Sequence, residues 1–80
     1  MKKIQILGSG CKKCNDLTAN ADKAAQAAGV EYSIEKVTQL NDIMAFGVMT
    51  TPGLVIDGKV VSQGKLLTVD QISAHLKNRH

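Results

Sequence analysis

The stretch IQILGSGCKKC, residues 4–14, joins a short apolar run, a glycine-rich loop and two cysteines. The run Ile4–Leu7 stops at Gly8-Ser9-Gly10, as a buried strand does where it enters a tight loop. Beyond the second cysteine, leucine and alanine recur at helical spacing until Gly29, which stands where a left-handed C-cap is expected. The stretch therefore predicts a strand, a loop, and a helix of about four turns that begins at the cysteines.

A second strand and a short helix are predicted next. Residues 30–37 alternate apolar and polar side chains, which indicates a strand with one buried face. Thr38 can cap a short helix that Gly47 closes. The apolar stripe expected on this helix consists of Leu40, Ile43, Met44 and Phe46.

The second half of the chain predicts a hairpin and a closing helix. Asp57-Gly58 separates two apolar runs, which is the strongest short-range signal for a two-residue hairpin. Thr68 and Gln71 fit a capping box at the start of the last helix. Its expected apolar face consists of Leu67, Val69, Ile72 and Leu76.

These elements predict an α/β fold in the order β-α-β-α-β-β-α. The alternating first half favours parallel strands with a right-handed crossover, whereas the hairpin strands are antiparallel. We expect a four-stranded mixed sheet flanked by three helices. A chain of 80 residues has room for one core, so residues 1–80 are expected to form a single domain.

Composition excludes several classes of function. The net charge of +3 comes from scattered basic residues, and Tyr32 and Phe46 are the only aromatic side chains. A binder of single-stranded nucleic acid would need aromatic stacking platforms, so no nucleic acid partner is expected. The N-terminal apolar run is too short for a secretion signal or a membrane span. We therefore expect a cytoplasmic protein with no membrane partner.

Cys11 and Cys14 are the candidate reactive residues. Two cysteines of a cytoplasmic protein rarely form a structural disulfide, because the compartment keeps thiols reduced. Cys11 lies at a helix N-terminus, where the helix dipole and Lys12 and Lys13 favour the thiolate and should lower its pKa. Cys14 follows one turn later, in line with the apolar side of the helix, and should be less exposed. This arrangement suits an attacking thiolate at Cys11 and a resolving thiol at Cys14.

A Cys-x-x-Cys pair also occurs in metal sites. A structural zinc site needs four ligands, and besides the cysteines the chain offers only His75 and His80. We interpret His75 as a helix-end residue and His80 as part of the terminus, so no structural metal site is expected. A copper(I) chaperone that binds through Cys11 and Cys14 remains the alternative.

Pro52 is the only proline and directly precedes the strand predicted at residues 54–56. An isolated X-Pro bond is usually trans, since only about 5–6% of such bonds are cis in folded proteins. Taken together, however, the cysteine loop, Thr50-Thr51-Pro52, the hairpin and the closing helix resemble the thioredoxin superfamily, in particular its small thioredoxin-like and glutaredoxin-like members. The resemblance covers nearly the whole chain.

The resemblance implies a cis Thr51-Pro52 bond beside the cysteines. It also implies that Gly10, Cys11, Thr51 and Pro52 form the groove that receives an extended partner. Two features depart from the family. The Trp-Cys-Gly-Pro-Cys context is absent, and Gln5 stands where thioredoxins carry a buried acid, so proton transfer from Cys14 must use water or another group.

The expected function is that of a thiol–disulfide oxidoreductase. Its substrate would be a disulfide-bearing protein or a small thiol compound, and a separate disulfide reductase would supply electrons without any bound cofactor. Glutathione is a possible electron donor, although Gln63-Gly64 and Asp70 match the glutaredoxin glutathione turn only loosely. The alternative, a ferredoxin-like copper chaperone, would usually carry methionine where this chain has Ser9 and would follow the order β-α-β-β-α-β.

Overall fold

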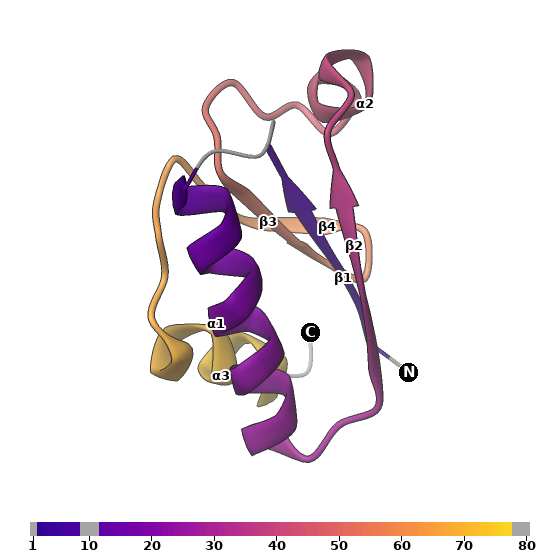
Figure 1. Cartoon of the computed structure of the whole chain (residues 1–80). Coiled ribbons are helices and arrows are strands. Elements are labelled where there is room, and N and C mark those ends of the chain that lie inside the picture. Colours follow the sequence, from indigo (N-terminus) through magenta and orange to yellow (C-terminus); the bar gives the residue numbers. More distant parts are fainter. Residues whose placement is uncertain (1, 9–11, 78–80) are drawn as a thin grey trace.

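A four-stranded sheet lies at the centre of the computed structural model, which describes residues 2–8 and 12–77 (Figure 1). The predicted α/β class and element order are confirmed. The elements are β1 (Lys2–Leu7), α1 (Lys12–Ala28), β2 (Tyr32–Val37), α2 (Leu40–Ala45), β3 (Gly53–Ile56), β4 (Lys59–Gln63) and α3 (Val69–Lys77).

The sheet has the strand order β2-β1-β3-β4. β1 pairs in parallel with β2 and antiparallel with β3, and β3 pairs antiparallel with β4. The expected hairpin turn is present, with φ of 52° at Asp57 and 82° at Gly58. Positive φ at both residues gives the turn the twist that an antiparallel pair of strands requires.

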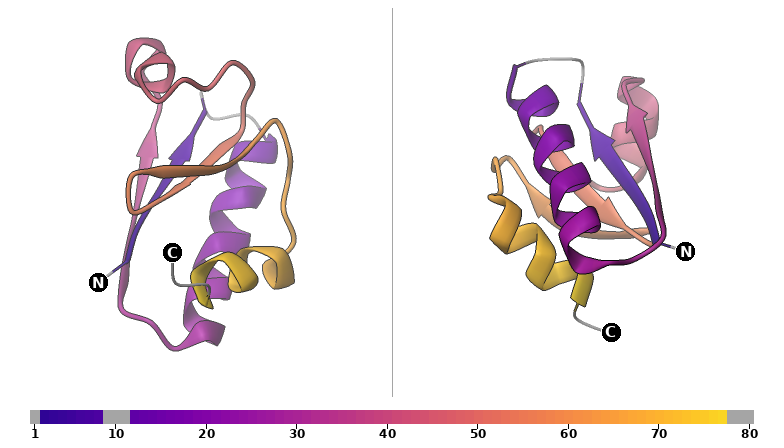
Figure 2. Two further views of the ribbon diagram at one scale, coloured as in Figure 1. Left: turned by 180° about the vertical axis from the view of Figure 1, so that it is seen from behind. Right: turned by 60° about the horizontal axis from the view of Figure 1, so that its bottom comes forward.

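The helices cover the two faces of the sheet unequally. α1 and α3 lie together on one side, and α2 lies on the other (Figure 2). The larger core cluster joins α1 and α3 to β1 and β3. The smaller cluster lies under α2 and consists of Leu7, Val37, Ile43, Val48 and Val55.

Small side chains let α1 pack closely within the larger cluster. Ala21, Ala24 and Ala25 are fully buried. Two hydrogen bonds join α1 to the C-terminal part of the chain: Asn20 Nδ2 donates to the Leu67 carbonyl oxygen at 2.9 Å, and Ser73 Oγ donates to the Ala24 carbonyl oxygen at 3.3 Å. These contacts fix α3 against α1.

The capping box of α3 forms as predicted. The Thr68 amide donates to Gln71 Oε1 at 3.0 Å, and the Gln71 amide donates to Thr68 Oγ1 at 3.2 Å. This reciprocal pair satisfies two backbone donors that the start of a helix otherwise leaves without an intrahelical partner.

Two expectations for α2 were wrong. Gln39, not Thr38, is the N-cap residue, and its side chain makes no capping hydrogen bond. Leu40 and Met44 are 68% and 61% exposed, so Ile43 is the buried residue of this helix. The reason is length, because a helix of six residues turns fewer side chains toward the sheet than the apolar stripe would need.

Asp57 links the hairpin turn to the start of β1. Its Oδ1 accepts a hydrogen bond from the Lys3 amide at 2.9 Å, and its Oδ2 lies 3.3 Å from Lys2 Nζ. The Lys3 amide, followed by the Lys2 ammonium group, lowers the pKa of Asp57 below its usual value. The ionised carboxylate is therefore the form that the fold favours.

We predict that Asp57→Asn makes the free energy of unfolding depend less steeply on pH in the acidic range. Because the folded-state pKa is lowered, the stabilisation is complete above about pH 4, the pKa of the unfolded chain, and is lost as the pH falls through the folded-state value. Urea unfolding from neutral pH to about pH 2.5 should show a steeper loss for the wild type than for D57N. Equal slopes for the wild type and D57N would contradict the prediction.

Candidate functional site

Cys14 lies in the first turn of α1 and is 4% exposed, as the helical pattern predicted. Its sulfur packs against the backbone at the end of β1. A Cβ atom added to Gly8 would lie 2.2 Å from Cys14 Sγ and 3.3 Å from Cys14 Cβ. Real Cβ atoms essentially never approach so closely, so only glycine fits at position 8 in this arrangement. Gly10 and Cys11, the other predicted site residues of this loop, lie outside the described residues.

Thr51 and Pro52 come from the loop before β3, and Thr51 lies close to Gly8. The peptide bond between them is cis, as the resemblance to thioredoxins implied and contrary to the statistical expectation for an isolated proline. Pro52 is buried, whereas Thr51 is exposed. The Cβ position of Gly8 lies 3.8 Å from Thr51 Cβ. The fold therefore brings Cys14 and Thr51 to the same end of β1, although 37 positions separate them in the sequence.

The loop that carries Thr51 is held by the end of β4. The Met49 amide donates to Gln63 Oε1 at 3.1 Å, and the Gly64 amide donates to the Pro52 carbonyl oxygen at 2.8 Å. Neither contact was expected from the sequence. The contact of Gly8 with Cys14 was also missed, and its only signal is a glycine three residues before the first cysteine.

The start of α1 is electrostatically positive. Lys12 and Lys13 are both exposed there, and the first turn holds no acidic residue. Their charges add to the positive end of the helix dipole rather than oppose it. An anion, including a thiolate, is stabilised at such a position.

A small cavity of about 40 Å³ adjoins Cys14. Its volume exceeds what one water molecule needs. Thr18, which donates from Oγ1 to the Cys14 carbonyl oxygen at 2.9 Å, contributes to its wall. The residues that line it are Ile6, Gly8, Cys14, Asn15, Thr18, Lys36 and Thr38.

Gln5 does not line this cavity. It is 7% exposed, and its Nε2 donates to Glu35 Oε1 on the neighbouring strand at 3.0 Å. The carboxylate that accompanies Gln5 therefore comes from β2. Gln5 stands at the position where thioredoxins have a buried acid, and its carboxamide is not a proton acceptor.

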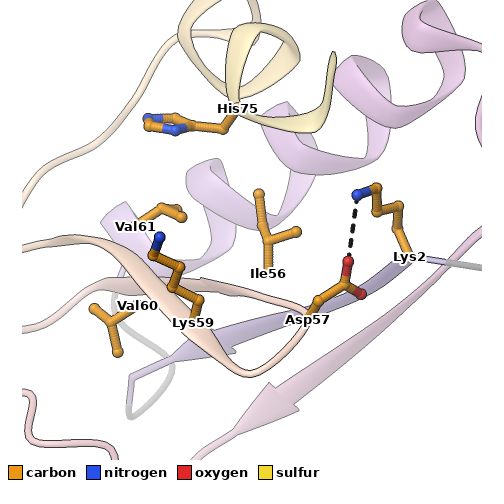
Figure 3. Close-up of a pocket in the computed structure, with 7 residues that line it drawn as sticks. All are labelled: Lys2, Ile56, Asp57, Lys59, Val60, Val61 and His75. Carbon is orange, nitrogen blue, oxygen red and sulfur yellow. Dashed lines mark ion pairs between the residues drawn. The ribbon is translucent and has the colours of Figure 1, made fainter. Parts of the chain in front are cut away.

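A wider groove of about 450 Å³ lies at the opposite end of the sheet (Figure 3). Lys2 at the start of β1 and His75 on α3 lie on its rim, around Ile56, and the Lys2–Asp57 ion pair closes one side. His75 lies near the end of α3, as predicted. This groove shares no lining residue with the cavity beside Cys14.

Within residues 2–8 and 12–77, no three His, Cys, Asp or Glu side chains form a group that could hold a metal ion. No helix in these same ranges has the length and apolar character needed to cross a bilayer.

We predict a strong coupling between Gly8 and Cys14. Gly8→Ala should destabilise the protein by about 1–3 kcal/mol, because its methyl group would overlap Cys14 Sγ. In a Cys14→Ala background the same change should cost less, since the overlapping sulfur is gone. Denaturant unfolding of the wild type, both single variants and the double variant measures this coupling. Purely additive effects of the two substitutions would contradict the packing described here.

Comparison with known proteins agrees with the fold. The family model described as "Thioredoxin domain" matches residues 2–77. A thioredoxin of Methanocaldococcus jannaschii is 40% identical over 75 residues, which cover 94% of this chain and 86% of that protein. A thioredoxin of Methanothermobacter thermautotrophicus is 35% identical over 72 residues, which cover 90% of this chain and 94% of that protein. The chain therefore belongs to the thioredoxin domain family.

Proposed function

We propose that this protein is a thiol–disulfide oxidoreductase that cycles Cys11 and Cys14 between dithiol and disulfide. Membership of the thioredoxin family supports a redox role. The observation that carries the proposal is the position of Cys14, buried in the first turn of α1 and packed against Gly8 beside Thr51. A buried thiol one turn into a positive helix end is suited to resolve a mixed disulfide rather than to start one.

The reaction has two exchange steps. The Cys11 thiolate attacks one sulfur of a partner disulfide, forms a mixed disulfide and releases the first partner thiolate. Cys14, after losing its proton, attacks the Cys11 sulfur, forms the Cys11–Cys14 disulfide and releases the second partner thiolate. Two electrons pass to the partner, whose two sulfurs leave reduced.

The proton of Cys14 needs an acceptor in the second step. Gln5 cannot serve, because a carboxamide does not take up a proton at neutral pH. The cavity beside Cys14 has room for water and polar walls that include Thr18 and Thr38. We assign proton release from Cys14 to water in this cavity.

The partner would be a disulfide-bearing protein or a small disulfide compound. It would lie along Gly10, Thr51 and Pro52, of which Thr51 is exposed and Pro52 is buried. A separate disulfide reductase would return the protein to the dithiol form, so no bound cofactor is part of the proposal. The same chemistry suits the cytoplasm, where such reductases keep thiols reduced.

The alternative role, copper(I) delivery through the same two cysteines, receives less support. The element order observed here is β-α-β-α-β-β-α and its last described element is α3. A ferredoxin-like chaperone follows a different order. The two functions also differ in what the thiols do, since a chaperone holds the metal and forms no disulfide during its cycle.

We predict a reversible two-electron transition of the cysteine pair. Titration in glutathione or dithiothreitol buffers, with alkylated thiols counted by mass, should place the midpoint between about −180 and −280 mV, with no change when copper(I) or zinc is added. Thiols that form no internal disulfide but are protected by one equivalent of metal would reject the oxidoreductase and support the chaperone.

Serine variants separate the roles of the two cysteines. Cys14→Ser should accumulate a mixed disulfide with an oxidised peptide, because Cys11 still attacks and nothing resolves the product. Cys11→Ser should form little of it, since Cys14 is buried. Mass spectrometry under non-reducing conditions counts both adducts. A stable adduct with C11S and none with C14S would reverse the assignment.

A further inference from the structure

We propose that Gln63 is a positioning residue for partner binding, and that it acts by fixing the loop formed by residues 49–52. This inference rests on the proposed function, because Thr51 and Pro52 receive the partner there. Gln63 is the last residue of β4, which is an edge strand of the sheet. Its side chain reaches from that edge to the backbone of the loop.

Gln63 holds the start of the loop. Its Oε1 accepts a hydrogen bond from the Met49 amide at 3.1 Å, although 14 positions separate the two residues. The Met49 side chain is 89% exposed, so it provides no apolar anchor of its own. Val48, the residue before Met49, is 3% exposed and is anchored by burial. Met49 is instead anchored by the hydrogen bond to the Gln63 side chain.

Gly64 holds the other end. Its amide donates to the Pro52 carbonyl oxygen at 2.8 Å. Its φ is +73°, and an added Cβ would lie 2.7 Å from Thr50 Oγ1, so glycine is needed for the loop to come so close. Gln63 and Gly64, consecutive residues at the end of β4, thus fix both ends of the loop and leave Thr50 and Thr51 exposed between them.

Fixing the loop should favour partner binding more than the exchange chemistry. An extended partner must find the loop backbone in one arrangement, and any freedom that the loop has beforehand is lost on binding. Without the Gln63 acceptor, the Met49 amide loses a protein partner and the loop gains freedom. A small disulfide, which makes few contacts with the backbone, should depend less on this order. Gln63 therefore acts on selection of an extended partner.

The test compares Gln63→Met with Gln63→Glu. The methionine keeps the length of the side chain but removes the oxygen acceptor, whereas glutamate retains it. Pre-reduced protein is mixed in a stopped-flow instrument with an internally quenched peptide disulfide or with dithiobis(nitrobenzoate). For the peptide, Q63M should raise the half-saturating concentration about 3–10-fold, the range expected for one net hydrogen bond, while the limiting rate falls less than about twofold. Q63E should restore most of the wild-type value.

The controls separate this inference from the function on which it rests. Lys65→Met introduces the same side chain two positions away, at an exposed site, and should behave as the wild type. The ratio of peptide to small-disulfide reactivity should fall in Q63M alone. If the wild type reduces both disulfides and Q63M keeps this ratio, or if Q63E is as defective as Q63M, the role of Gln63 is overturned. If the wild type reduces neither disulfide, the proposed function itself is rejected, and with it the inference.

Discussion

The packing of α1 against β1 is the contact on which the rest of the structure depends. Leu17 and Ala21 of the helix and Ile4 of the strand are fully buried together in the larger core cluster. Because the helix buries mainly alanines, its axis can lie close to the sheet and to α3. The same packing brings Cys14 into close contact with Gly8 at the end of the strand. The core and the candidate site are therefore parts of one contact surface.

Local patterns in the sequence predicted most of the fold. Alternation and helical spacing located the elements, Asp57-Gly58 located the hairpin, and Thr68 with Gln71 located the start of α3. Each of these signals depends on neighbours a few positions apart, which is why a single sequence reveals it. The prediction of a buried Cys14 succeeded for the same reason, since it continued the apolar side of α1.

Contacts between distant residues were not visible in the sequence. No short-range sequence pattern predicts the hydrogen bond from the Met49 amide to Gln63. It forms because the end of β4 lies beside a loop 14 positions earlier in the chain. Thr38 was expected to cap α2, yet the helix begins after Gln39. The path of the chain as it leaves β2 outweighs the preference of threonine for the N-cap position. The positions of Thr51 and Pro52 were foreseen only through the family resemblance, since an isolated proline would be assigned the trans form.

The unequal covering of the sheet also bears on how the molecule moves. α2 is anchored by Ile43 alone among its six residues, whereas α1 and α3 share the larger core. Elements with few buried apolar contacts detach at a lower free energy than the whole molecule unfolds, and their amides exchange with solvent earlier. We therefore expect α2 to detach more readily than α1 and α3. Its detachment would reduce the cover over the smaller core cluster, which includes Leu7 and Val37, and would leave the α1 side of the sheet in place.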